Sequence, residues 1–467
     1  MGLRDSASYA ATVDLSAREA VSMNPQQPLP PKRRRPGLVP GLIGGAAVLV
    51  ALVLVVVFVV VPGGRSDQVS GQAEAAGAGG GSDGGNGGPP ADGVYLTQQP
   101  GTRPPPKWNS TPITNACAVL PLSEVLKEGI TFDGAYELFD VGVPHDVQSV
   151  SKVGAIIYDA GGGSDGITNC LYPGDSNTDD IVVQVFQAPE AVADAISAFN
   201  IISTDTAGSE KQTVGGWQVV TVPLKDDKNS WQVGFTDTGH KYFAELDITL
   251  RKAGYAGHTP QQVIADFATT IRQNLDKSPL PAPTYHYAAP YAQVPDPCDL
   301  FTADDFTTLT GKQDDIVNRK FQFGERGVNP DPGINLPDAN YTEMSCERDT
   351  IGAVTESASD GDAFGIHVDV EVFRNAQQAR TGMYAECDPR SSGAKVFGPS
   401  VQVSLKIGDD RVCFPDEGRN DWRMTFRSGR VVIFMQNVAM LQKSQLQNEA
   451  NVFAPTARQM AAQVAGL

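Results

Sequence analysis

Positive charge is scarce in this sequence. Its 467 residues include 36 Lys and Arg against 54 Asp and Glu, which gives a formal net charge of −18 at pH 7. A protein that binds nucleic acid through the phosphates needs a basic face that displaces counterions. The balance therefore excludes an electrostatic nucleic-acid binder, and we expect no nucleic-acid partner.

Patterns that would hold a metal ion or a cofactor are also missing. The five His form no His-x-x-x-His pair and no HExxH motif. The six Cys contain no C-x-x-C, and the closest two are Cys387 and Cys413. Zinc and redox sites use close pairs of this kind. We therefore expect no metal site and no cofactor.

Two short motifs resemble functional sites but lack their required context. Gly162–Gly166 matches the G-x-S-x-G of serine hydrolases, yet the residues after Ser164 favour a strand where that motif needs a helix. Asp175–Asp180 begins like a calcium loop, but its sixth and twelfth positions are not the required Gly and Glu. Both are predicted to be loops, so no residue is assigned a catalytic role and the protein is not expected to be an enzyme.

One long apolar run stands near the N-terminus. Residues 42–61 carry no polar or charged side chain, and as a helix they would reach about 30 Å, the thickness of a hydrocarbon core. A signal peptide has a shorter apolar stretch that ends near a small-residue cleavage site. The run therefore predicts a single transmembrane helix within 37–62 that inserts into the cytoplasmic membrane.

The flanks of this run predict the orientation and the first segments of the chain. Lys32–Arg35 adjoin one end, and such clusters stay in the cytoplasm. Residues 1–36 are then a short cytoplasmic tail, Pro-rich and basic, whose start is either Met1 or Met23. Residues 63–111, rich in Gly and Pro, are predicted to be a flexible stalk that leads to an extracytoplasmic part.

The remainder of the chain contains two similar copies of one sequence pattern. The residues around Cys117 resemble those around Cys298, and a second Cys follows in each copy, at Cys170 and Cys346. Next comes a strand followed by a helix, 181–186 into 189–199 in the first copy and 366–373 into 375–384 in the second. Trp231, Phe235 and Phe243 have the same spacing as Trp422, Phe426 and Phe434, which predicts the same hairpin twice.

An amphipathic helix is expected to close each copy. Apolar residues recur at steps of four, at Val263, Phe267, Ile271 and Leu275 in the first copy. In the second copy the expected stripe is Val452, Thr456, Met460 and Val464.

We therefore predict an α+β fold with two tandem similar domains, 112–283 and 294–467, each with an antiparallel sheet and flanking helices. Residues 284–293, next to a Pro-rich stretch, are predicted to be an extended spacer between them.

The repeat also restricts how the cysteines pair. If Cys117 matches Cys298 and Cys170 matches Cys346, each copy joins its own two Cys, and Cys387 pairs with Cys413. All six lie after the membrane segment, on the side where disulfides persist. We expect three structural disulfides.

A family resemblance rests on the start of the second copy. The run Asp296–Phe306 with Gly311, followed by Cys346, resembles the DUF3558-like family of actinobacterial cell-envelope domains, and the whole exterior resembles a duplicated form of it. More loosely, the anchor, stalk and disulfide-bearing exterior resemble the extracellular sensor domains of mycobacterial membrane kinases. The resemblance implies a cell-envelope location and no particular activity.

These observations predict a membrane-anchored, extracytoplasmic binding or sensing module of the bacterial cell envelope. It would be a single-pass protein of the cell membrane, with its N-terminus in the cytoplasm and an envelope ligand or protein as partner. A cell-envelope hydrolase that uses the Gly162–Gly166 loop and a passive structural or scaffolding protein are the alternatives.

Overall fold

The computed structural model describes residues 94–467 apart from 109, 133, 147–167, 174–178, 188, 226, 240, 351–364, 416–421 and 438–442. Residues 42–61 lie outside this part, so the membrane helix stays a prediction. No helix among the described residues is long and apolar enough to cross a membrane.

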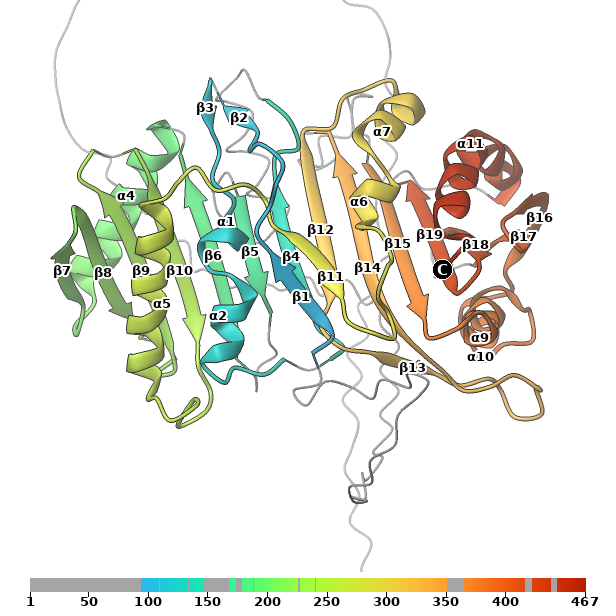
Figure 1. The fold of residues 1–467 in the computed structure, drawn as a ribbon, viewed down its shortest axis with the longest axis horizontal. Coiled ribbons are helices and arrows are strands. Elements are labelled where there is room, and N and C mark those ends of the chain that lie inside the picture. Colours follow the sequence, from blue (N-terminus) through green and yellow to red (C-terminus); the bar gives the residue numbers. More distant parts are fainter. Residues whose placement is uncertain are drawn as a thin grey trace, which may run out of the picture. The chain divides into compact units, whose positions relative to one another are not determined.

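The described chain contains these elements (Figure 1). The helices are α1 (Ala116–Val119), α2 (Leu122–Lys127), α4 (Pro189–Asp205), α5 (Pro260–Leu275), α6 (Pro297–Leu300), α7 (Ala303–Thr310), α9 (Ala376–Cys387), α10 (Ser392–Phe397) and α11 (Leu446–Val464), with a 3₁₀ turn η2 (Lys443–Gln445). The first strands are β1 (Leu96–Gln99), β2 (Lys107–Trp108), β3 (Thr111–Pro112), β4 (Glu137–Gly142), β5 (Thr168–Tyr172), β6 (Asp180–Phe186), β7 (Glu210–Val214), β8 (Trp217–Pro223), β9 (Ser230–Asp237), β10 (Phe243–Thr249) and β11 (Thr284–Tyr287). The remaining strands are β12 (Ile316–Gln322), β13 (Arg326–Val328), β14 (Ala339–Asp349), β15 (Gly365–Phe373), β16 (Val401–Ile407), β17 (Asp410–Phe414), β18 (Met424–Ser428) and β19 (Val431–Asn437).

The prediction of two separate α+β domains, each with its own sheet, is wrong. Fifteen strands of the described chain form a single antiparallel sheet that runs through both halves. Strand β4 of the first half pairs with β12 of the second half, with Phe139 opposite Lys320. Each strand would otherwise present an unpaired edge, and edges of this kind recruit other strands. Pairing β4 with β12 removes both edges and makes the two sheets continuous.

The strand order is the same on both sides of this junction. Outward from β4 the order is β5, β6, β10, β9, β8 and β7, and outward from β12 it is β14, β15, β19, β18, β17 and β16. What repeats is therefore the path of the chain through half a sheet. The hairpins β9–β10 and β18–β19 fall where the two Trp and Phe patterns predict them.

A buried ion pair lies at the junction itself. The Arg319 guanidinium on β12 pairs with Asp140 on β4, and their side chains are only 13% and 2% exposed. Asp140 also accepts hydrogen bonds from Asn115 at 2.8 Å and from the Tyr285 hydroxyl at 3.1 Å. Arg319 reaches Asp296 at 3.3 Å. These contacts connect both halves of the sheet through side chains as well as through the backbone.

Two segments expected to be linkers contribute to this structure. β1 lies in the predicted stalk and β11 in the predicted spacer, and the two pair antiparallel from Leu96–Tyr287 to Gln99–Thr284. Tyr95, Leu96, Tyr285 and Tyr287 are buried in the main core. Residues 94–99 are therefore part of the folded unit.

Helices cover the two faces of the sheet unequally. α1, α2, α5 and α11 pack on one face over the largest apolar core, and Figure 1 shows α1, α2, α5 and α6 in front of the strands. On the opposite face α4 covers a small cluster around Phe243, and α9 covers another around Phe373. The strip between these two helices is where the candidate site lies.

Three disulfides brace the fold. Cys117–Cys170 joins α1 to β5, Cys298–Cys346 joins α6 to β14, and Cys387–Cys413 joins α9 to β17. These are the pairs that the repeat predicts, and they indicate an extracellular or secreted protein.

Candidate functional site

The candidate site is a strip of polar side chains on the face of the sheet that carries α4 and α9. Strand side chains alternate between faces, and directly opposed residues share a face. The strand register then places one set of polar side chains on the same face of the sheet, and we call this set the polar face. It comprises Glu137, Asn169, Gln184, Glu245, Asp247, Asn318, Lys320, Gln322, Glu343, Ser345, Glu347, Asp349, His367, Asp369 and Glu371.

Strand β15 shows how the sequence produces this face. Val368, Val370 and Val372 are fully buried in the main core. His367 and Asp369 alternate with them and point to the polar face. On β12 and β14 the positions from Asn318 to Gln322 and from Glu343 to Asp349 that share this face are also polar, so three adjacent strands contribute polar residues to one strip.

A network of ion pairs connects the centre of the polar face. The His367 imidazole lies 3.0 Å from Asp369, and Arg423 approaches the same carboxylate at 3.6 Å. On the neighbouring strands Lys320 lies 3.7 Å from Glu347. These basic side chains lower the pKa values of both carboxyls, although burial acts in the opposite direction. Asp369 and Glu347 are therefore ionised at neutral pH.

Burial opposes the ionisation of other acids on the face. Burial raises the pKa of Glu343 to about 8, and the nearby Glu137 and Asp369 add to the shift. Arg326 donates to Glu343 at 3.0 Å, but this single ion pair does not outweigh burial and two like charges. Burial likewise raises the pKa values of Glu137, Glu245, Asp247, Asp349 and Glu371, that of Asp247 to about 6.

Several acceptors on the face have no hydrogen-bond partner among the described residues. They are Asn169 Oδ1, Asn318 Oδ1, Gln322 Oε1 and Ser345 Oγ, on side chains that are at most 5% exposed. The amide orientations of two are fixed, because Asn318 Nδ2 donates to Glu347 and Gln322 Nε2 donates to the Gly324 carbonyl. Buried polar groups rarely stay unpaired, so these oxygens call for donors that the described residues do not supply.

The arrangement favours a ligand with many donors and positive charge. Acidic side chains outnumber basic ones in the polar face, and its unpaired amide atoms are oxygens. Carboxylates and amide oxygens accept hydrogen bonds, whereas an ammonium group only donates them.

Two of the motifs singled out in the sequence fall outside this site. Gly162–Gly166 lies outside the described residues, as do positions 175–178 of the expected calcium-like loop. Asp179 is described, and its carboxylate accepts from the Tyr255 hydroxyl at 2.7 Å and from the Arg251 amide at 2.8 Å. Asp179 is thus used within the fold.

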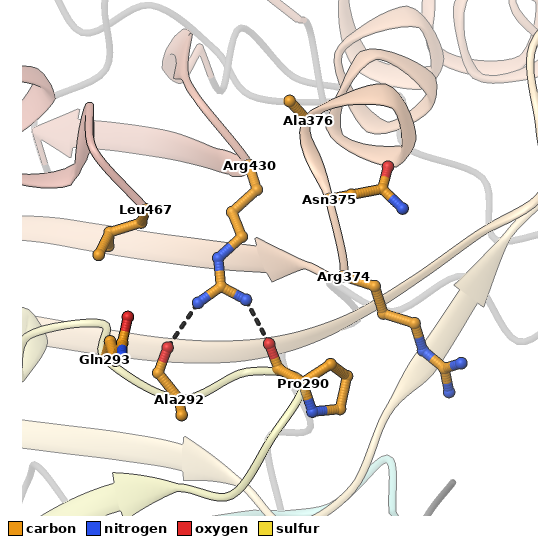
Figure 2. A pocket seen from close by; sticks show the side chains of 8 residues that line it. All are labelled: Pro290, Ala292, Gln293, Arg374, Asn375, Ala376, Arg430 and Leu467. Atoms are coloured by element: carbon orange, nitrogen blue, oxygen red, sulfur yellow. Dashed lines mark hydrogen bonds between the residues drawn. The ribbon is translucent and has the colours of Figure 1, made fainter. Parts of the chain in front are cut away.

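A pocket of about 440 Å³ lies at the start of α9 (Figure 2). Figure 2 shows the Arg430 guanidinium donating to the carbonyls of Pro290 and Ala292, while Arg374 points away from it. Arg374 in turn pairs with Glu325 at 2.8 Å. Arg430 thus holds the segment after β11 and Arg374 is engaged in an ion pair within the fold, so we assign this pocket a structural role.

Comparison with known proteins gives no family. No model of a known protein family matches the chain, and no curated protein matches it either. The resemblance to the DUF3558-like family therefore stays a prediction.

Proposed function

We propose that this protein is an extracytoplasmic binding module whose polar face holds a positively charged ligand rich in hydrogen-bond donors. The observation that carries the proposal is the polar face, where half-buried carboxylates and unpaired amide oxygens lie side by side. Burying such groups without a partner costs free energy. A ligand that supplies donors and positive charge would offset that cost, which accounts for the presence of these carboxylates and amide oxygens in the polar face.

The proposal includes the location predicted from the sequence. The disulfides indicate an extracellular or secreted protein. We further propose that residues 42–61 tether it to the cytoplasmic membrane of a bacterial cell envelope, with residues 1–36 in the cytoplasm. In this proposal the module binds or senses an envelope ligand and is non-enzymatic.

Titration of the purified full-length chain with spermine, followed by calorimetry, tests the binding proposal. We expect saturable binding at pH 8 that weakens as salt is added, because salt screens charge attraction. Glu347→Gln removes one ionised carboxylate and should weaken binding about tenfold, which is about 1.4 kcal/mol of binding free energy. Lys320→Gln removes a competing positive charge and should strengthen it.

Glu210→Gln is the matched control, because Glu210 lies on β7, whose side chains are all exposed. It should leave spermine affinity unchanged. Equal affinities for the wild type, Glu347→Gln and Lys320→Gln would refute the polar face as the binding surface.

A further inference from the structure

Three potential metal ligands meet at α2 and α5, on the face of the sheet opposite the polar face. Glu128 caps the C-terminus of α2, His258 precedes α5, and Asp266 lies within α5. One ligand atom from each lies within 4.8 Å of the other two. His258 Nδ1 is 2.8 Å from Glu128 and 3.3 Å from Asp266.

The backbone around His258 is closely constrained. Tyr255 and His258 exchange two backbone hydrogen bonds, of 2.8 and 2.6 Å, around a turn in which Ala256 and Gly257 have positive φ. The Tyr255 ring is buried, and its hydroxyl donates to Asp179 at 2.7 Å. The imidazole therefore projects from a turn whose position is fixed.

The end of α2 packs directly against this turn. Gly129 has φ +77°, and a Cβ atom there would lie 2.9 Å from the Ala256 backbone nitrogen. Only glycine fits both the conformation and the close approach. This contact brings the Glu128 carboxylate to His258, and the Thr259 capping box starts α5 so that Asp266 follows two turns later.

The charges of the three groups call for a cation. The Glu128 side chain is only 6% exposed, and the hydrogen bond it makes is with His258. His258 Nδ1 faces both carboxylates, at 2.8 and 3.3 Å, but a single ring nitrogen can direct one full hydrogen bond at only one of them. A metal ion between the three atoms would bind both carboxylates and the imidazole nitrogen together.

We propose that Glu128, His258 and Asp266 form a binding site for a divalent first-row transition metal ion. One imidazole and two carboxylates suit Zn²⁺, whereas Ca²⁺ and Mg²⁺ prefer oxygen ligands alone. His258 and Asp266 are 43% and 52% exposed, so solvent reaches the site and water would complete the coordination. The bound ion would join α2 to α5.

Calorimetric titration of the EDTA-treated, dialysed full-length chain with ZnCl₂ tests this site. We expect one Zn²⁺ per chain and a higher melting temperature in its presence, because binding stabilises the folded state. His258→Ala and Asp266→Asn should each weaken Zn²⁺ binding by more than about tenfold, since losing even an outer-shell partner of a metal site costs that much. Asp266 is half exposed, so its amide variant should fold.

His286→Ala is the matched control, because His286 is an exposed residue of β11 outside the cluster. It should bind Zn²⁺ as the wild type does. No Zn²⁺ binding by the wild type would overturn the proposal, and so would unchanged affinity in both His258→Ala and Asp266→Asn. Neither result bears on spermine binding by the polar face.

Discussion

Arg319→Leu is expected to destabilise the folded protein by about 3–5 kcal/mol, the cost typical of breaking a buried ion pair. The Asp140 side chain is only 2% exposed, and the substitution leaves its carboxylate without a positive partner. Hydrogen bonds from Asn115 and Tyr285 remain, but they bring no charge. Urea denaturation monitored by tryptophan fluorescence measures the change.

Arg103→Leu is the matched control for this prediction. Arg103 pairs with Asp299 at 2.7 Å, but the two side chains are 79% and 44% exposed, so its loss should cost less than about 1 kcal/mol. The double variant Asp140→Leu/Arg319→Leu should recover part of the loss, because the buried Asp140 charge is then removed and only Asp296 still lacks its partner. If Arg319→Leu costs no more than Arg103→Leu, the junction is not held by this ion pair.

Glu343→Gln is expected to become increasingly stabilising, relative to the wild type, as the pH rises from 5 to 9. The pKa of Glu343 is about 8 in the folded protein, above its ordinary value of 4.5. The folded state therefore binds more protons than the unfolded state between these two values, and wild-type stability falls with pH across that window. Glutamine cannot ionise, so the free energy of unfolding of the variant should fall less with pH than that of the wild type, by on the order of 1–4 kcal/mol.

The measurement is the free energy of unfolding of both proteins at pH 5, 7 and 9. Glu210→Gln, on the exposed strand β7, serves as the control and should run parallel to the wild type. A constant difference between Glu343→Gln and the wild type over the whole range would show that Glu343 is not a buried acid with a raised pKa.

The local elements could be predicted from the sequence because short-range patterns determine them. The strand and helix at 181–199 appear as β6 and α4, and those at 366–384 appear as β15 and α9. All four residues of the first closing stripe, Val263 to Leu275, are buried in α5. In α11 the stripe is right at Thr456, Met460 and Val464, but Val452 is 46% exposed and Phe453 is buried in its place. A step of four drifts from the 3.6-residue period over several turns.

The joining of the two halves could not be predicted from the sequence in the same way. Strands β4 and β12 pair through backbone groups, which leave no mark in the side-chain pattern, and Asp140 and Arg319 are far apart in the chain. Likewise β1 has only four residues, and its partner β11 is distant in the chain: the paired residues Thr97 and His286 are 189 positions apart. A short polar strand of this kind resembles a linker in sequence.

The polar face was missed for a related reason. An alternating strand such as Ile366–Phe373 predicts one buried and one solvent-exposed face, and its polar positions carry no sign of being enclosed. Only the register shows that Glu343, Glu347 and Asp369 lie on one strip and that α4 and α9 flank it. The proximity of Glu128, His258 and Asp266 could not be predicted either, because their spacing follows no metal-binding motif.

Labelling of carboxyl groups with a diazo ester, which esterifies acids without activating them toward amines, tests the ligand-binding role of the polar face most directly when it is done with and without spermine. Peptide mass spectrometry of the labelled full-length chain reports each acid separately. We predict that spermine protects Glu343, Glu347 and Glu371, while Asp304, exposed on α7, is labelled equally in both samples. Equal labelling of the polar-face acids with and without bound spermine, or protection confined to exposed acids elsewhere, would contradict the account.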